Sequence, residues 1–475
     1  MKTIVYELNE VPKKLFDFFA EAKPASSFAR LKTHSNLFTT SAADMGHLSP
    51  WVTWPTLHRG VSNVVHNIAD IGEDLSDRDR ELPPIWKMLA AQGISVGVFG
   101  SLQSYNMDQD LENYEFFVPD TFAAGPECFP KDLSAFQKFN LSMVEKSGKN
   151  VNARIAMSEA AEFLLRAPLL GLTGATTLRL AGQVMSERLN SDRLVRRRTS
   201  QAEIAFDFYF RQLEKTRPDI SFFFTNHVAS SLHRYWPTVF PKDYDEGKFD
   251  ETWLSRWSGE IPHAVRVADV QLHRLMNFAN KNQYRLLVLS SMGQDAVEEA
   301  EPVHSQILIT DLNALMKYLG YDEGQWEPKL AMAPQVVAAV ATDALLDERL
   351  QKLDDLRVNG TTLNYKVLKN VGVQFDIFCD NQDTVEVIDA GGQRIEASMV
   401  GLSNVPIQDK VSVTAYHTPE GILIDYNPAK SPTKSDDEWG SVSVLDVAPS
   451  LLQSFGIEKP AHMIGDNKLF MQESA

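Results

Sequence analysis

The chain has 475 residues, with 46 Lys plus Arg against 63 Asp plus Glu, which gives a formal net charge of −17. A hydrophobic share of 44% allows a large core and excludes global disorder. The acidic excess argues against broad, non-specific binding to nucleic acid or to an anionic membrane. Two cysteines exclude a disulfide framework and a thiolate cluster, so a metal site must use His, Asp, Glu or Asn ligands.

The amino terminus (MKTIVYELNE) lacks the charged, apolar and small-residue order of a signal peptide and is expected to form a strand. The most apolar stretch, 163–182, is interrupted by Arg166, Pro168 and Arg179. It is therefore too polar to serve as the run of about 20 apolar residues that a membrane-spanning helix needs. We expect a cytoplasmic protein with no membrane span and no nucleic-acid partner.

Strand-like and helical runs alternate along the chain. Apolar runs predict strands at 3–8, 95–99, 220–224, 285–290 and 307–310. Helical spacing or helix-stop residues predict helices over 85–92, 202–215 and 265–280. This alternation predicts an α/β fold with a central, mostly parallel sheet and helices on both faces. In such sheets the loops at the carboxyl ends of the strands form the functional site.

Two regions are expected to be additions to this core. The predicted α/β core comprises 1–132, 201–345 and 401–475, the predicted helical insertion is 133–200, and the predicted β-rich lid is 346–400. The insertion carries a basic cluster that is either a solvated helix face or an anion-binding lid, formed by Arg193, Arg196, Arg197 and Arg198. The lid is predicted from the alternation in 373–377 and a glycine turn at 391–392.

The most informative segment is 51–60 (WVTWPTLHRG), which continues to a histidine and an isoleucine at 66 and 68. It places the hydroxyls of Thr53 and Thr56 three residues apart, on either side of Trp54-Pro55 and ahead of a predicted helix. The free N–H groups and the dipole of a helix N-terminus favour an anion at such a position. The plainer alternative is an ordinary threonine N-cap.

This segment resembles the nucleophile region of the alkaline phosphatase superfamily, in particular the type I phosphodiesterase/nucleotide pyrophosphatase branch. Asn67 stands where that branch usually has glycine. The segments 417–424 (HTPEGILI) and 446–452 (DVAPSLL) resemble later motifs of the same family in the same order. The resemblance implies an alkaline-phosphatase-like fold and two-metal phosphoryl or sulfuryl transfer, with a threonine or serine as nucleophile.

Several of the metal ligands that the resemblance implies are replaced. Asn9 takes the place of the first-strand aspartate, Ser291-Met292 takes the place of an Asp-His pair, and Ala229 takes the place of an aspartate. Glu7 ends the first predicted strand and could reach a site, whereas Glu10 is expected to open the following loop. One of the two metal sites would therefore keep only neutral groups and Glu7.

Two histidines match the family pattern, namely His233 and His417. With His227 or Asn226 they would form a site for a single zinc or another divalent metal. Residues six apart on a helix differ by about 240°, so His227 and His233 can share an ion only if the chain between them is not a continuous helix.

Without a second ion the threonine hydroxyl needs a general base, and His58 is the candidate. The alternative for His58 is a helix-face histidine bonded to a carbonyl. Trp54, Arg234 and Trp236 flank the candidate site and are predicted to bind a phosphorylated or sugar-containing small molecule, although core packing is the commoner use of tryptophan.

Three functional hypotheses follow. The first is a divergent metal-dependent hydrolase or transferase of phosphate, phosphodiester or sulfate esters, with one ion or an altered pair. The second is a catalytically inactive descendant that binds a phosphorylated or sugar ligand through backbone N–H groups and arginines. The third is a structural partner in surface-polysaccharide synthesis, suggested by uncharacterised chains with a similar Glu-Leu-Asn-Glu start. The oligomeric state is left open.

Overall fold

The structure is a computed structural model. It describes residues 1–104, 111–123, 125–146, 167–297, 305–329, 331, 335–340, 345–368, 371–406, 413–430, 432 and 438–470. Within these residues, no helix is long and apolar enough to cross a membrane.

An eight-stranded sheet forms the centre of the main body, in the order β20-β2-β19-β6-β1-β5-β3-β4. Strand β1 (Thr3–Leu8) is entirely buried and pairs in parallel with β5 (Ile220–Thr225) and β6 (Arg285–Leu289). Such continuous apolar runs are typical of parallel strands covered on both faces. The remaining strands are β3 (Val96–Phe99), β4 (Phe116–Val118), β2 (Asn36–Ser41), β20 (Trp439–Ser443) and the antiparallel β19 (Glu420–Tyr426). The predicted α/β class is confirmed.

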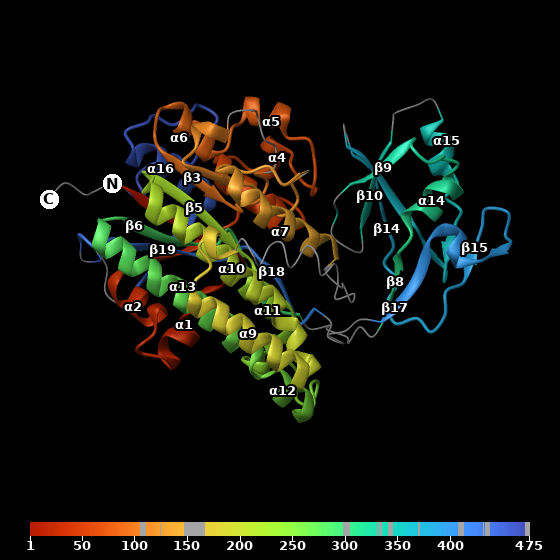
Figure 1. Ribbon diagram of the computed structural model, residues 1–475, viewed down its shortest axis with the longest axis horizontal. Helices are drawn as coiled ribbons and strands as arrows, with labels where there is room; N and C mark the ends of the chain where they lie inside the picture. Colours follow the sequence, from red (N-terminus) through yellow and green to blue (C-terminus); the bar gives the residue numbers. More distant parts are fainter. Residues whose placement is uncertain are drawn as a thin grey trace.

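Helices cover both faces of this sheet (Figure 1). One apolar cluster contains Ile4 and Tyr6 of β1 and buried residues of α1 (Lys13–Ala22), α2 (Ser27–His34), α10 (Arg197–Thr216), α11 (His227–Tyr235) and α13 (Glu260–Asn282). The other contains Val5 and buried residues of α3 (Pro50–Arg59), α6 (Ile85–Ala91) and α16 (Val447–Ser454). Alternate residues of β1 thus face opposite layers, as the period of a strand requires.

Shorter elements complete the main body. They are α4 (Asn63–His66), α5 (Ser76–Glu81), α12 (Glu251–Trp257) and the antiparallel pair β7 (Gly293–Ala296) and β18 (Ala415–Thr418). The predicted insertion at 133–200 contributes α7 (Ser134–Lys146) and α9 (Gly174–Leu189), while its residues 147–166 lie outside the described part of the chain.

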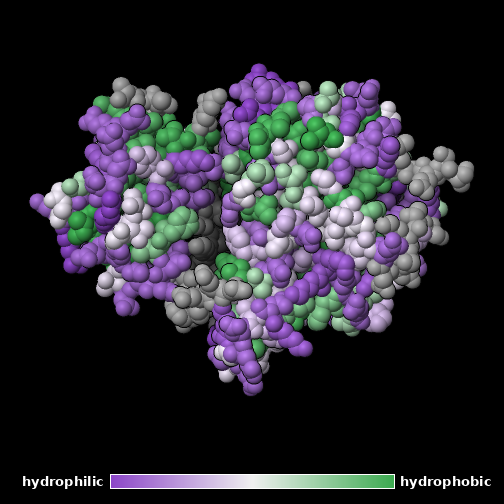
Figure 2. Space-filling model, turned by 180° about the vertical axis from the view of Figure 1, so that it is seen from behind, coloured by the Kyte–Doolittle hydropathy of each residue, from purple (hydrophilic) through white to green (hydrophobic). Residues whose placement is uncertain are grey.

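A second body stands beside the main one, and a groove separates the two on the face seen in Figure 2. Its own apolar core runs from Ile307 to Leu402 and therefore extends beyond the 346–400 range predicted for a lid. The body contains α14 (Leu312–Leu319), α15 (Leu346–Gln351), β8 (Ser305–Ile309), β9 (Trp326–Lys329), β10 (Val336–Val340), β11 (Arg357–Val358), β12 (Thr361–Thr362), β13 (Asn364–Leu368), β14 (Gly372–Asp376), β15 (Val387–Ile388), β16 (Arg394–Ile395) and β17 (Leu402–Pro406). The strand predicted at 307–310 thus pairs with β17 here and not with the central sheet.

Candidate metal centre

Helix α3 carries the threonine that the motif singled out. It begins after Ser49, whose hydroxyl accepts a hydrogen bond from the N–H of Trp51, and it ends at Gly60, whose φ of 62° suits glycine. Thr53 is fully buried, and its hydroxyl lies 2.7 Å from the hydroxyl of Ser291. Ser291 stands where the family has a ligand aspartate, so the threonine faces a neutral group.

The second hydroxyl, that of Thr56, is committed to a local network. It donates to Asp44, and it accepts from Nε2 of His66 at 2.8 Å because Nδ1 of that ring accepts the N–H of Ile68 at 2.9 Å. Asp44 also accepts the N–H of Asn63 at 3.0 Å. These bonds fasten the loop before α3 and helix α4 onto α3, which leaves Thr53 as the more available of the two hydroxyls.

Neutral amides occupy the place of the first-strand ligand. Asn9 donates from Nδ2 to Asn226 at 2.8 Å and to Glu10 at 2.7 Å, and its Oδ1 accepts from the indole N–H of Trp54 at 2.7 Å. This bond shows that Oδ1 of Asn9 is already engaged and that Trp54, which is fully buried, serves packing and hydrogen bonding. The structure therefore does not direct Trp54 toward a ligand.

Glu7 and His58 form a separate buried pair. Nε2 of His58 lies 2.6 Å from the carboxylate of Glu7, and the hydroxyl of Ser101 donates to the same carboxylate at 2.8 Å. Both side chains are fully inaccessible to solvent. His58 is thus held by Glu7 rather than by Thr53, and the structure does not bring either residue to the histidines described below.

His227 joins two helices. Its Nδ1 lies 2.7 Å from the hydroxyl of Thr225, and its Nε2 lies 3.1 Å from the carbonyl oxygen of Ala264 on α13. Burial lowers its pKa to about 4, so the ring is neutral near pH 7. Because α11 is continuous from His227 through His233, the two side chains point to different sides of the helix and do not share an ion.

Glu10, His233 and His417 converge instead. Their ligand atoms all lie within 4.8 Å of one another. Oε2 of Glu10 is 2.9 Å from Nε2 of His233 and 3.4 Å from Nε2 of His417. Two ligands of a tetrahedral zinc, each about 2.0–2.1 Å from the ion, lie roughly 3.3 Å apart, so the three atoms suit one ion.

Backbone carbonyls orient both imidazoles. Nδ1 of His233 donates to the carbonyl of Ala415 at 2.7 Å, and Nδ1 of His417 donates to the carbonyl of Leu48 at 2.8 Å. With Nδ1 protonated, the lone pair of a neutral imidazole is on Nε2, the nitrogen that faces Glu10. This is the arrangement by which proteins prepare histidines to bind a metal.

The carboxylate of Glu10 and the two imidazole nitrogens that face it need a cation or protons between them. Burial opposes ionisation of Glu10, but the two histidines hold its pKa well below its usual range. Burial opposes protonation of His417, yet the hydrogen bond and the charge of Glu10 raise its pKa. Two neutral Nε2 lone pairs facing a carboxylate oxygen repel it, so either protons on the rings or one bound cation satisfies the site.

The sequence favours Glu7 over Glu10 as the carboxylate that could reach a site. Glu10 does lie in the loop after β1, as expected, but it is this carboxylate that meets the two histidines. The loop turns back at a φ of 55° and buries the carboxylate. The side chain of Gln294 donates both to Glu10 and, at 3.3 Å, to the carbonyl of Ala229, the position that lacks the family aspartate. The loop after β1 thus supplies a carboxylate near α11, where Ala229 has none. An acidic residue two positions after the end of β1 is the signal that the sequence offers.

The remaining predicted ligand-binding residues are engaged in the fold. Trp236 is fully buried and donates to Asp243 at 2.7 Å, while Arg234 donates to the carbonyl of Ser230 on its own helix at 2.8 Å. In the basic cluster, Arg193 and Arg196 pair with the buried Glu260, and Arg197 pairs with Glu187. These three arginines therefore have structural partners.

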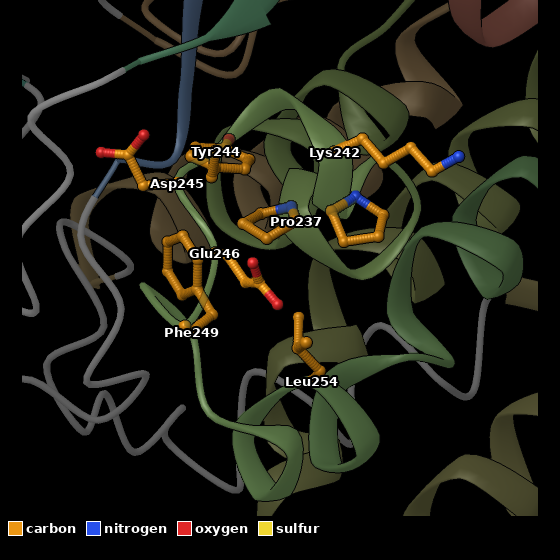
Figure 3. A pocket seen from close by; sticks show the side chains of 9 residues that line it. Pro237, Lys242, Tyr244, Asp245, Glu246, Phe249 and Leu254 are labelled. Carbon is orange, nitrogen blue, oxygen red and sulfur yellow. The ribbon is translucent and has the colours of Figure 1, made fainter.

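A pocket is lined by residues that follow Trp236 in the chain (Figure 3). Its lining includes Pro237, Phe249 and Leu254, with the carboxylate of Glu246 among them. None of its lining residues belongs to the cluster of Glu10 and the two histidines.

No protein-family model and no curated protein gives a significant match to the sequence. Similar solved structures include murine ectonucleotide pyrophosphatase/phosphodiesterase 5, at 10% identity over 97% of each chain with a TM-score of 0.39. A mutant of the alkaline phosphatase PafA matches at 11% identity, over 98% of this chain and 97% of that one, with a TM-score of 0.41. Phosphonoacetate hydrolase from Sinorhizobium meliloti matches at 13% identity over 94% of each chain, with a TM-score of 0.38.

All three proteins are members of the alkaline phosphatase superfamily, which the sequence motifs resemble.

Proposed function

We propose that this chain is a single-ion metalloprotein that hydrolyses or transfers phosphate esters, with the ion held by Glu10, His233 and His417. The observation that carries the proposal is the geometry of the two imidazoles. Both rings bond a backbone carbonyl through Nδ1 and turn Nε2 toward one buried carboxylate. Zinc or another divalent ion with an open coordination position suits such a ligand set.

A bound divalent ion would polarise a phosphoryl oxygen as a Lewis acid. The neutral groups of Asn9, Thr53 and Ser291 supply no negative charge for a second ion, which is why the proposal is limited to one. Thr53 is the proposed nucleophile, because Thr56 is committed to Asp44 and His66. In the transfer step the oxygen of Thr53 would bond to phosphorus as the bond to the leaving alcohol breaks, and the proton of Thr53 would pass through the hydroxyl of Ser291, 2.7 Å away, to the departing oxygen.

The direct test is to load the purified protein with zinc or manganese and assay aryl phosphate, phosphodiester and sulfate esters. Thr53→Ala should lower the rate by about a thousandfold or more, while Thr53→Ser should retain part of it. Thr33→Ala, which removes an exposed hydroxyl bonded only to its own helix, is the matched control. A protein that takes up no transition metal and cleaves none of the esters would refute the proposal.

A second candidate function is binding of a phosphorylated or sugar-containing ligand without catalysis. The full burial of the Thr53 hydroxyl and the neutral groups at the second family site favour it. Calorimetry on the metal-loaded protein, with inorganic phosphate and glucose 1-phosphate as probes, tests this ligand-binding function separately from catalysis. Under this alternative both wild type and Thr53→Ala bind the probe with equal affinity and neither turns over any ester. Absence of binding at millimolar probe concentrations eliminates it.

A further inference from the structure

Three strongly exposed apolar side chains lie together in the loop before α3 and in α4. Met45 is 71% exposed, Val64 is 72% exposed and Val65 is 53% exposed. Single exposed apolar residues are ordinary, but a group of them on adjoining segments is characteristic of a binding surface. We call Met45, Val64 and Val65 the apolar rim.

Hydrogen bonds hold the two segments of the apolar rim together. The side chain of Asn63 accepts the N–H of Met45 at 3.0 Å and donates to its carbonyl at 2.8 Å. Asp44 accepts the N–H of Asn63 at 3.0 Å and the hydroxyl of Thr56. The rim is therefore attached to α3, the helix that carries Thr53, and is pre-organised for a ligand.

A short stretch of chain connects the apolar rim to the candidate metal centre. Leu48, three residues after Met45, accepts the Nδ1 hydrogen bond of His417, and three residues span at most about 11 Å. Between them, Nε2 of His47 lies 3.3 Å from the hydroxyl of Tyr416. The ring of Tyr416 lies 4.2 Å from that of His417, centroid to centroid. A ligand of modest length can touch the rim and the metal centre together.

We propose that the apolar rim binds an aliphatic substituent of the phosphate ester whose phosphoryl group reaches Glu10, His233 and His417. The inference rests on the proposed function and names the substrate class: phosphate esters with an alkyl or acyl chain. Methionine and valine offer flexible and branched aliphatic contacts, and their burial by a chain removes apolar surface from water. Binding energy from such a remote group can serve the reacting centre.

The test uses the full chain loaded with zinc and a homologous series of methyl, butyl and octyl p-nitrophenyl phosphate diesters. We expect kcat/KM to rise with chain length. In the double variant Val64→Ser/Val65→Ser it should fall about tenfold for the octyl ester and stay unchanged for the methyl ester. Met45→Ser should also lower kcat/KM for the octyl ester and leave that for the methyl ester unchanged. Ile464→Ser is the matched control, because Ile464 is 78% exposed and lies in another segment.

Binding of methyl and octyl phosphate, measured by calorimetry, gives a readout that does not need turnover. Tighter binding of octyl phosphate that the rim variants abolish supports the inference even if no ester is cleaved, in which case only the catalytic proposal fails. Esters cleaved and phosphates bound equally at all chain lengths overturn the inference and leave the proposed function standing. Rim-dependent co-sedimentation with phosphatidylcholine vesicles, without a chain-length effect, overturns it in favour of a membrane surface.

Discussion

At the scale of single residues, the candidate metal centre contains one carboxylate, that of Glu10. Glu10 comes from the loop after β1, whereas the family position on α11 is Ala229. Asn9 and Gln294 donate hydrogen bonds to Glu10, which fixes its two oxygens. Such supporting bonds orient a ligand and make its substitution costly.

Glu10→Gln should weaken zinc binding by about a hundredfold or more, because a neutral amide replaces the charged ligand while the volume stays the same. The measurement is competition of wild type and variant against a chromogenic zinc chelator. Asp295→Asn is the matched control, since this carboxylate is 59% exposed, accepts the N–H of Ala296 and lies 3.7 Å from the ammonium of Lys14. Unchanged affinity in Glu10→Gln would show that the ion is bound elsewhere.

The sequence predicts the two histidines of this centre because their spacing within recognisable motifs is preserved in the chain. It does not predict Glu10, because the turn that carries the carboxylate back has a φ of 55°, which most side chains disfavour. It also leaves His227 as an alternative ligand, since its commitment to Ala264 depends on how α11 packs against α13. Ligands that arise from tertiary packing are not visible in local sequence patterns.

At the scale of elements, His227 links α11 to α13 and should make the protein sensitive to acid. Its pKa is lowered to about 4 in the folded state, against about 6.5 unfolded. As the pH falls from 6.5 to 4, the unfolded chain binds a proton that the folded chain does not. Stability therefore falls, by roughly 3 kcal/mol at most.

Urea unfolding of wild type and His227→Gln between pH 7 and pH 4 measures this effect. The variant should show a shallower loss of stability with acid, because the proton uptake at this position is gone. His273→Gln, which alters an exposed histidine bonded to Asn277, should keep the wild-type slope. Parallel pH profiles for wild type and His227→Gln would contradict the assignment of His227 as a buried neutral side chain.

The buried Glu260 of α13 pairs with two arginines of the 133–200 region. Glu260→Gln on α13 leaves Arg193 and Arg196 without their buried partner and should destabilise the protein by about 2–3 kcal/mol. Glu187→Gln is the comparison, because its partner Arg197 is 49% exposed and exposed pairs contribute at most about 1 kcal/mol. Equal unfolding midpoints for both variants in denaturant would show that the cluster has no structural role.

The sequence predicts the buried parallel strands but not the short polar strand β2 or the pairing of β8. The apolar runs of β1, β3, β5 and β6 are found as strands of the central sheet, since their burial on both faces leaves a clear pattern. The sequence does not predict strand β2 (NLFTTS), because this strand is short and partly polar. The run at β8 was recognised as a strand, but its partner β17 lies about 100 residues away, and nothing local indicates that pairing.

At the scale of the whole molecule, the second body has its own core and meets the main body at an ion pair between Lys366 and Asp70. Asp70 follows α4, the helix that carries part of the apolar rim. The predicted division into core, insertion and lid stays a prediction, and the core that runs from Ile307 to Leu402 gives a boundary to test by expressing 305–406 alone.

The acidic excess of the whole chain contributes little to the candidate metal centre. Of 63 acidic residues, one carboxylate lies with His233 and His417 within the described part of the chain, and it is not at a family ligand position. Neutral groups at Asn9 and Ser291 replace the charge that a second ion would require. The proposed site therefore holds one ion for each chain.

The most direct measurement is an anomalous-difference map at the zinc edge from a crystal of the zinc-loaded protein. We expect one peak for each chain, within about 2.0–2.2 Å of Oε2 of Glu10 and of Nε2 of His233 and His417. Two peaks at this site, a peak held by other residues, or no peak there would contradict it.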